Sequence, residues 1–178
     1  MVVKTVKNEA SAPAADDEFV ITRLISAPPS LVYKAWTEPK HLAAWWGPKI
    51  FTNPVCDLDV RVGGEYRIVM QSPQGVNYPI KGVFREIVPN KRLVMTMDCS
   101  EHPQEWHDLV NPTPEMRQKN PVREMVMTVF FDNAGGKTQL TIRVRMASKA
   151  IRDSLLKLGM TEGWSESLQK LEKMLAKN

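Results

Sequence analysis

The spacing of apolar and polar residues changes along the chain and predicts the order of its secondary-structure elements. Residues 19–26 form a β-branched run that is typical of a strand with apolar side chains on much of both faces. From Ser30, apolar residues recur at three- and four-residue spacing, and Pro39 ends this helical pattern. Residues 40–46 predict a second short helix, which Gly47 closes. The chain is therefore predicted to begin with one strand and two short helices.

A two-residue period then begins and continues through most of the remaining chain. It marks six strand-like runs, with Gly, Pro and Asn in the turns between them. These runs cover residues 55–60, 65–70, 80–88, 92–98, 123–131 and 138–146. Because short turns join most of them, we expect neighbouring strands to be antiparallel. The exception is 100–121, a polar connection with four prolines that is longer than a hairpin needs, and we expect it to flank or cover an opening.

The two ends of the chain differ in character. Residues 1–17 contain few large apolar side chains, so we expect a flexible tail in front of a single domain at 18–178. The C-terminal residues carry two apolar stripes about 180° apart, which no straight helix can bury against one surface. Gly159 and Gly163 lie where the phase changes. A short helix, a break, and a main helix from about residue 161 are therefore predicted.

This order of elements predicts an α+β fold. The crossover helices of a parallel βαβ fold are missing, so we expect the seven strands to form one curved antiparallel sheet. The long C-terminal helix is the element that can cover the apolar face of this sheet, with the two short helices after the first strand at one end. A strongly curled sheet would leave an elongated apolar cavity between itself and the helix.

Methionines in the predicted strands are candidates for the wall of such a cavity. Met95 and Met97 share one strand face, as do Met125 and Met127, and Met70 lies on another strand. Methionine is unbranched and polarizable, so it suits a surface that accepts varied apolar shapes. A solid but irregular core uses methionine in the same way, so both interpretations stay open.

Arginine and the C-terminal aromatic residue add further candidates. Arg67, Arg85 and Arg143 lie on predicted strands, where they either face water or point inward to a carboxylate or hydroxyl group of a ligand. Trp164 and Leu168 belong to the inward stripe of the final helix, where they would close the core or form the floor of the cavity.

Two other tryptophans have separate expected positions. Trp45, with Trp36 and Trp46, is expected to pack the short helices against the sheet, and it is also a candidate for the cavity wall. Trp106 lies within the long connection and is a candidate lid residue.

Composition and charge narrow the function classes. The chain has 178 residues, 43% of them hydrophobic and 25% charged, which is typical of a globular protein with its own core. Its 24 Lys and Arg and 20 Asp and Glu are interspersed, so no nucleic-acid partner is expected. No apolar stretch is long enough to insert into a membrane. Cys56 and Cys99 lack metal-binding spacing, and we expect reduced thiols in a cytoplasmic protein.

The sequence carries no catalytic signature. It has no Gly-rich phosphate loop, no GxSxG elbow and no dinucleotide fingerprint. His102 and His107 lie in the long connection with Glu101, Glu105 and Asp108, a set that can bind metal or shuttle protons. Polar residues are ordinary in a solvated loop, however, and this spacing matches no zinc signature. We therefore predict no catalytic residue, no metal and no cofactor.

Four separated motifs resemble those of a known family. They are AWTEP at 35–39, WWGP at 45–48, VGGEYR at 62–67 and GWSESL at 163–168. In order and spacing they resemble the bacterial homologues of the activator of Hsp90 ATPase, which belong to the START/Bet v 1-like superfamily. The resemblance covers about residues 18–176. It implies the helix-grip fold, in which a curved sheet holds a long helix.

Three functions stay open on these observations. The favoured one is binding of a small hydrophobic or aromatic molecule in the cavity by a carrier, sensor or sequestering protein. The second is an enzyme such as a cyclase or hydrolase, because other branches of the superfamily catalyse reactions in the same cavity. The third, implied by the family name, is a module that contacts an Hsp90-type chaperone. A homodimer is also left open.

Overall fold

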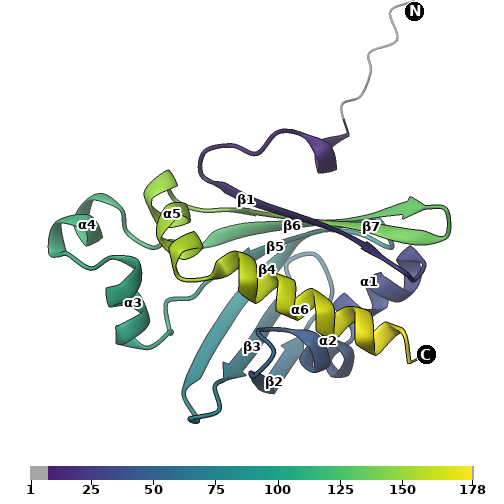
Figure 1. Ribbon diagram of the computed structural model, residues 1–178, viewed down its shortest axis with the longest axis horizontal. Coiled ribbons are helices and arrows are strands. Elements are labelled where there is room, and N and C mark those ends of the chain that lie inside the picture. The colour runs from purple at the N-terminus through teal and green to yellow at the C-terminus, as the bar shows by residue number, and fades with distance from the viewer. Residues whose placement is uncertain (1–7, 178) are drawn as a thin grey trace, which may run out of the picture.

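The computed structural model describes residues 8–177, which form a seven-stranded antiparallel sheet curled around a long C-terminal helix (Figure 1). The strand order is β1-β7-β6-β5-β4-β3-β2, so every neighbouring pair except β1 and β7 is also consecutive in sequence. The strands are β1 (Glu18–Ile25), β2 (Thr52–Leu58), β3 (Glu65–Gln71), β4 (Asn77–Val88), β5 (Arg92–Met97), β6 (Met125–Ala134) and β7 (Lys137–Arg145). The predicted α+β helix-grip fold is confirmed.

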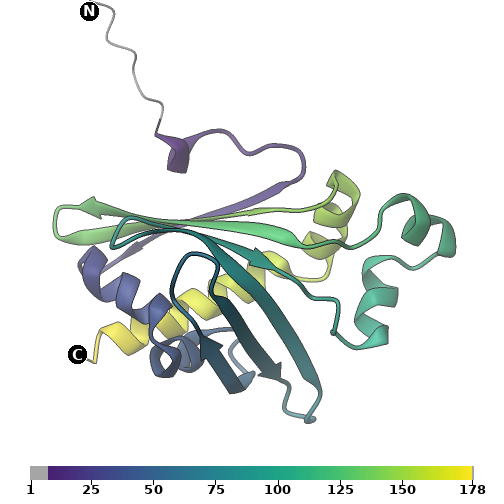
Figure 2. The ribbon, with the colours of Figure 1, turned by 180° about the vertical axis from the view of Figure 1, so that it is seen from behind.

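The helices lie on one face of the sheet and at its ends. They are α1 (Pro29–Thr37), α2 (Pro39–Trp45), α3 (Gln104–Val110), α4 (Pro114–Lys119), α5 (Lys149–Lys157) and α6 (Met160–Leu175), after a short 3₁₀ helix, η1 (Glu9–Ser11). Helix α6 runs along the inner face of the sheet beside α1 and α2, while α3 and α4 project beyond one end, next to α5 (Figures 1 and 2).

The apolar core fills the space between the inner face of the sheet and the helices. Strand β7 shows the alternation that creates it, because Leu140, Ile142 and Val144 are completely buried, one on every second position. Burying each such side chain contributes about 1.5–3 kcal/mol. Trp36 and Trp45 belong to the same core, and the expectation that they pack the two short helices against the sheet is confirmed.

The sheet is irregular where β4 meets β5. The pairing register shifts between Phe84 and Glu86, which is a β-bulge and increases the local bend and twist. Gly82 lies beside this bulge, and a Cβ atom at this position would collide with the carbonyl oxygen of Thr96. The Tyr66 hydroxyl donates a hydrogen bond to the same oxygen over 2.6 Å. This close backbone approach requires glycine and accompanies the curl of the sheet.

The C-terminal helix is broken where the apolar stripes change phase. Helix α5 begins at the Ser148 cap, whose hydroxyl accepts a hydrogen bond from the Ile151 amide, and it ends at Lys157. Gly159 then adopts φ = 92°, a left-handed conformation that side chains rarely tolerate, and α6 starts at the next residue. The predicted break and the start of the main helix are confirmed within one residue.

The structure departs from the sequence expectations at three places. No helix was predicted in the long connection at 100–121, which contains α3 and α4. The first strand is not apolar on both faces, since Leu24 is 54% exposed. The flexible tail was expected over 1–17; residues 1–7 lie outside the described part, but 8–17 lie across the outer face of the sheet (Figures 1 and 2).

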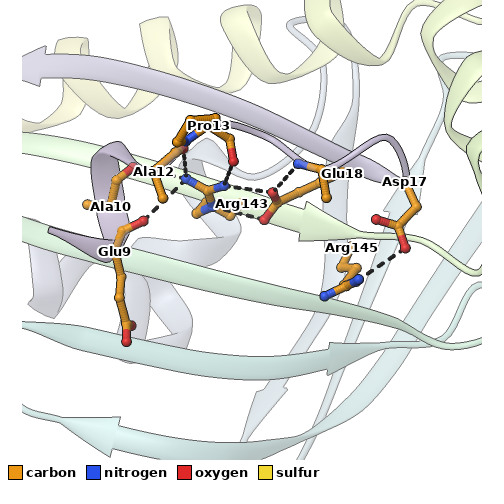
Figure 3. A network of polar contacts seen from close by, with 9 residues as sticks. Glu9, Ala10, Ala12, Pro13, Asp17, Glu18, Arg143 and Arg145 are labelled. Carbon is orange, nitrogen blue, oxygen red and sulfur yellow. Dashed lines mark hydrogen bonds and ion pairs between the residues drawn. The ribbon is translucent and has the colours of Figure 1, made fainter. Parts of the chain in front are cut away.

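Arg143 attaches this N-terminal segment to the outer face of β7. Its side chain is only 9% exposed, because residues 9–18 cover it. The guanidinium donates hydrogen bonds to both carboxylate oxygens of Glu18, 2.9 and 2.7 Å away, and to four backbone carbonyl oxygens between residues 9 and 13 (Figure 3). The bond from Arg143 holds the pKa of Glu18 below its usual value. A long-range ion pair and four hydrogen bonds to backbone carbonyl groups thus attach the segment before β1 to the sheet.

We predict that Arg143→Met destabilises the fold by about 3 kcal/mol, because it leaves the Glu18 carboxylate and several carbonyl groups without their donor. Chemical denaturation measures this loss, and amide hydrogen exchange should become faster in residues 9–17. Arg145→Met is the matched control. Its side chain is 66% exposed and pairs with Asp17, so it should cost less than about 1 kcal/mol. Equal costs for the two variants would contradict the anchoring role.

Candidate functional site

A cavity of about 240 Å³ lies between the sheet and the first half of α6. The strands contribute Met70 of β3, Ile80 of β4, Met97 of β5 and Met125 of β6. The opposite side comes from the end of α5, from α6, from α3 and from residues 46–48. Because the inward side chains of four neighbouring strands meet one broken helix here, the curl of the sheet positions the whole site.

Sulfur atoms form much of the cavity wall. Met70, Met97, Met125 and Met160 all line it, and the buried thiol of Cys99 lies at the end of β5. Thioether side chains are flexible and make favourable contacts with aromatic rings. Such a wall can adapt to an apolar ligand of varied outline, and it favours aromatic ligands in particular.

Indole rings form the other part of the wall and fix its position. Trp164 of α6 is stacked on Trp36 of α1, with ring centroids 6.3 Å apart and planes inclined by 16°. Its edge also meets Trp46 at 5.4 Å. Trp46 and Trp164 face the cavity, as does Trp106 from α3. Aromatic pairs of this kind are worth about 0.5–1.5 kcal/mol beyond their burial, so α6 is held firmly against the short helices.

Residues 46–48, which close one side of the cavity, and the adjacent Lys49 are held by polar contacts from α6. The Lys49 amide donates a hydrogen bond to the Glu166 carboxylate over 2.8 Å. One turn later, the Lys170 ammonium donates to the carbonyl oxygens of Trp46 and Pro48, at 3.2 and 3.3 Å. Burial lowers the pKa of Lys170, with Glu166 acting in the opposite direction. These contacts lie outside the cavity and leave its interior apolar.

The structure places the predicted apolar candidates in two groups. Five of them line the cavity, namely Met70, Met97, Trp106, Met125 and Trp164. The other four lie in the surrounding core, each at most 2% exposed, and do not line it: Trp45, Met95, Met127 and Leu168. Trp45 instead packs on Trp36, and its indole N–H donates to the Ala35 carbonyl oxygen. Whether the five lining residues contact a ligand stays a prediction.

The three arginines expected as polar cavity residues point elsewhere. Arg67 pairs with Glu101 at 2.7 Å, and Arg85 pairs with Glu124 at 3.1 Å, both on the solvent side of the sheet. Arg143 is buried, but under the N-terminal segment on the outer face. Strand alternation explains this outcome, because the residue before each arginine in sequence, namely Tyr66, Phe84 or Ile142, faces the core.

Sequence reasoning missed several lining residues. On α6 these are Met160, Gly163 and Ser167, which lie three and four residues apart and therefore share one helix face. The sequence did contain a signal for a cavity at this place. Two small residues, Gly163 and Ser167, interrupt a stripe of large apolar side chains and leave room beside Trp164. Leu158, which is 41% exposed, and residues 46–48 were also missed as lining residues. They directly follow the ends of α5 and α2, where the helical pattern stops.

His102 is buried beside the cavity, in contact with the lining residue Trp106. Its side chain packs edge-on against Trp106, with ring centroids 4.5 Å apart, and against Tyr78 at 5.5 Å. Neither ring nitrogen has a hydrogen-bond partner among residues 8–177. Burial lowers the pKa of His102 to about 4; His107 lowers it further and Asp98 opposes the shift. The imidazole is therefore uncharged at neutral pH.

A second, larger hollow of about 800 Å³ lies over β2, β3 and β4. Charged side chains line it, and the two positively charged ones, Arg67 and Lys81, form ion pairs within the protein. Arg67 and Lys81 both bind Glu101, at 2.7 and 2.9 Å, and together lower the pKa of that carboxyl to about 2. Residues 8–177 contain no group of three His, Cys, Asp or Glu side chains arranged to hold a metal. We therefore take the apolar cavity as the candidate site.

Comparisons with known proteins agree with this fold. The sequence profile of the family described as Activator of Hsp90 ATPase homolog 1-like protein matches residues 26–176. A crystal structure from Nitrosomonas europaea is 26% identical, covers 93% of this chain and 97% of its own, and has a TM-score of 0.75. One from Rhodobacter sphaeroides is 22% identical, with coverages of 94% and 97% and a TM-score of 0.77. No curated protein sequence is significantly similar.

Acid should destabilise the protein through His102. Its pKa is near 4 when folded and near 6.5 when unfolded, so the unfolded chain binds a proton first, and this contribution to stability falls as pH drops from about 6.5 to about 4. We predict that the free energy of unfolding falls by about 2 kcal/mol more in the wild type than in His102→Phe between pH 7 and pH 4.5. Urea denaturation at both pH values measures it, and equal losses would contradict the prediction.

Proposed function

We propose that this chain, which belongs to the family of Activator of Hsp90 ATPase homolog 1-like proteins, binds a small hydrophobic molecule in the cavity between its sheet and α6. The observation that carries the proposal is the cavity itself, because its wall is built almost entirely from thioether, indole and aliphatic groups. Affinity would come from removing apolar ligand surface from water, at about 25 cal/mol per Å².

The size of the cavity limits the ligand. Its volume of about 240 Å³ lies below the roughly 300–1,000 Å³ of typical ligand pockets. An apolar cavity of about 150 Å³ is large enough to bind benzene. We therefore infer a ligand of one or two rings, or an aliphatic molecule of similar volume, rather than a sterol or a long-chain lipid.

The lining chemistry favours binding over catalysis as the proposal. Cys99 is the one lining residue in the described part of the chain whose side chain titrates. Burial raises the pKa of its thiol to about 12, with a smaller contribution from Asp98, so the nucleophilic thiolate is disfavoured. An enzyme acting on an apolar molecule would need at least two reactive groups converging on it. The role of carrier, sensor or sequestering protein fits this wall better.

The family description also points to a chaperone as partner. The cavity geometry supports a small ligand more directly, so we keep chaperone contact as the alternative that an ATPase assay with the cognate chaperone would test. A cytoplasmic location is part of the proposal. It is supported by two free cysteines, Cys56 and Cys99. Residues 8–177 hold no helix long and apolar enough to span a bilayer. Native mass spectrometry would report a co-purified ligand and a homodimer together.

We predict that Gly163→Leu fills the cavity and weakens binding of naphthalene at least tenfold. A Cβ atom at Gly163 would meet Pro48 at 3.7 Å, an ordinary contact, so the longer side chain can enter the cavity without a clash at its base. Because three indoles line the cavity, intrinsic tryptophan fluorescence should report naphthalene binding to the wild type.

Gly163→Ala is the matched control. It adds one methyl group and should stabilise α6 by about 0.5–1 kcal/mol while retaining most of the naphthalene binding. Both variants should remain folded, as judged by circular dichroism and thermal denaturation. If the wild type fails to bind naphthalene, or if Gly163→Leu binds it unchanged, the cavity is not the binding site.

A further inference from the structure

A buried imidazole without partners adjoins the proposed cavity. His102 is 9% exposed, and both of its ring nitrogens lack a hydrogen bond within residues 8–177. Buried polar groups in folded proteins are nearly always paired, because an unpaired one forfeits its hydration without compensation. A donor and an acceptor left unused at one buried ring therefore indicate a partner from outside the chain.

The surroundings of His102 connect it to the cavity on three sides. Trp106, which packs against its ring, lines the cavity directly. Tyr78, on its other side, is paired across the sheet with Met70, and paired residues share one face of a sheet. The backbone amide of His102 donates to the carbonyl oxygen of Cys99, another lining residue. His102 is therefore separated from the cavity by a single layer of side chains.

The polar side chains of the cavity wall are committed, weak or able only to donate, and the indole N–H groups of Trp46, Trp106 and Trp164 belong to the last kind. The Ser167 hydroxyl donates to the Gly163 carbonyl oxygen over 2.8 Å. The Cys99 thiol is a poor donor. By contrast, an uncharged imidazole offers one strong donor and one strong acceptor. Among the side chains beside the cavity in the described chain, His102 is thus the one that offers a strong unpaired acceptor to a ligand hydroxyl, together with a donor.

The charge state of the ligand follows from the same surroundings. A ligand carboxylate or ammonium would enter an apolar wall that offers no opposite charge, which is costly. The titratable groups that influence the pKa of His102 are His107 and Asp98, and neither lines the cavity. A hydroxyl group can pair with neutral imidazole without placing a charge in the wall, and the sulfur and indole groups favour an aromatic ring.

On the basis of the proposed function, we propose that the cavity takes a small aromatic molecule with one uncharged hydroxyl group, and that His102 hydrogen-bonds this hydroxyl when the Trp106 indole turns aside. Trp106 lies on α3, a seven-residue helix that projects beyond the sheet and packs beside α5 (Figure 1). It is only partly buried, so turning this indole disturbs less packing than moving a core side chain.

The test compares naphthalene with 2-naphthol, which share a ring system and are both uncharged at pH 7. Fluorescence titration gives the ratio of their dissociation constants in the wild type and in His102→Phe, which keeps an aromatic ring between Tyr78 and Trp106. One neutral hydrogen bond corresponds to about fivefold in affinity. The preference for 2-naphthol should therefore fall about fivefold or more in His102→Phe.

His107→Phe is the matched control, because it makes the same substitution on the other histidine in contact with Trp106. It should leave the preference unchanged. In the wild type, the imidazole ¹⁵N resonances of His102 should shift with 2-naphthol and stay in place with naphthalene, which tests the contact even if His102→Phe does not fold. The same preference in the wild type and His102→Phe, or unshifted resonances, would overturn the role of His102. Failure of both probes to bind the wild type would overturn the proposed function instead.

Discussion

The packing of four indole rings determines how closely α6 can approach the sheet. Trp36, Trp45 and Trp46 come from the two short helices and the residue that follows them, and Trp164 of α6 is stacked against this group. Close-packed rings cannot be compressed, so α6 stays at the distance that they impose. Where Leu168 and Leu171 follow, the core is filled, but Gly163 and Ser167 are too small to reach across, and the cavity lies beside them.

Much of the fold was predictable because its signals are local. The two-residue period located the strands, although β2 begins and ends earlier than predicted and β6 is shifted later. Gly159 and the change of helical phase located the break before α6. The helix α4 was missed despite a local signal, since the Thr113 hydroxyl caps it and Pro114 begins it. Its polar composition resembles that of a loop, and periodicity detects only helices that bury one face.

The cavity lining was less predictable than the fold. The strand period tells which face a side chain is on, but not whether that side chain lines a cavity or lies within the packed core. Met95 pairs with Met127 and Met97 with Met125, so alternation correctly places all four on the inner face. The second pair lines the cavity, whereas the first lies under other core side chains. On the outer face, Arg143 likewise shows that alternation does not predict burial. Alternation assigns it to solvent, but residues 9–18, which are 125 or more positions away in sequence, cover it.

Polar interactions in this protein lie around the cavity rather than in it. Arg143 anchors the N-terminal segment outside the sheet, and Glu166 and Lys170 hold residues 46–49 from the outer side of α6. These contacts hold the surrounding segments in place without placing a charge where an apolar ligand would lie. An apolar cavity with an adaptable wall binds mainly through the area it buries, and it discriminates poorly between molecules of similar size. Selectivity therefore requires an unpaired polar group at its edge, and His102 provides one at the side where the wall is formed by a movable indole.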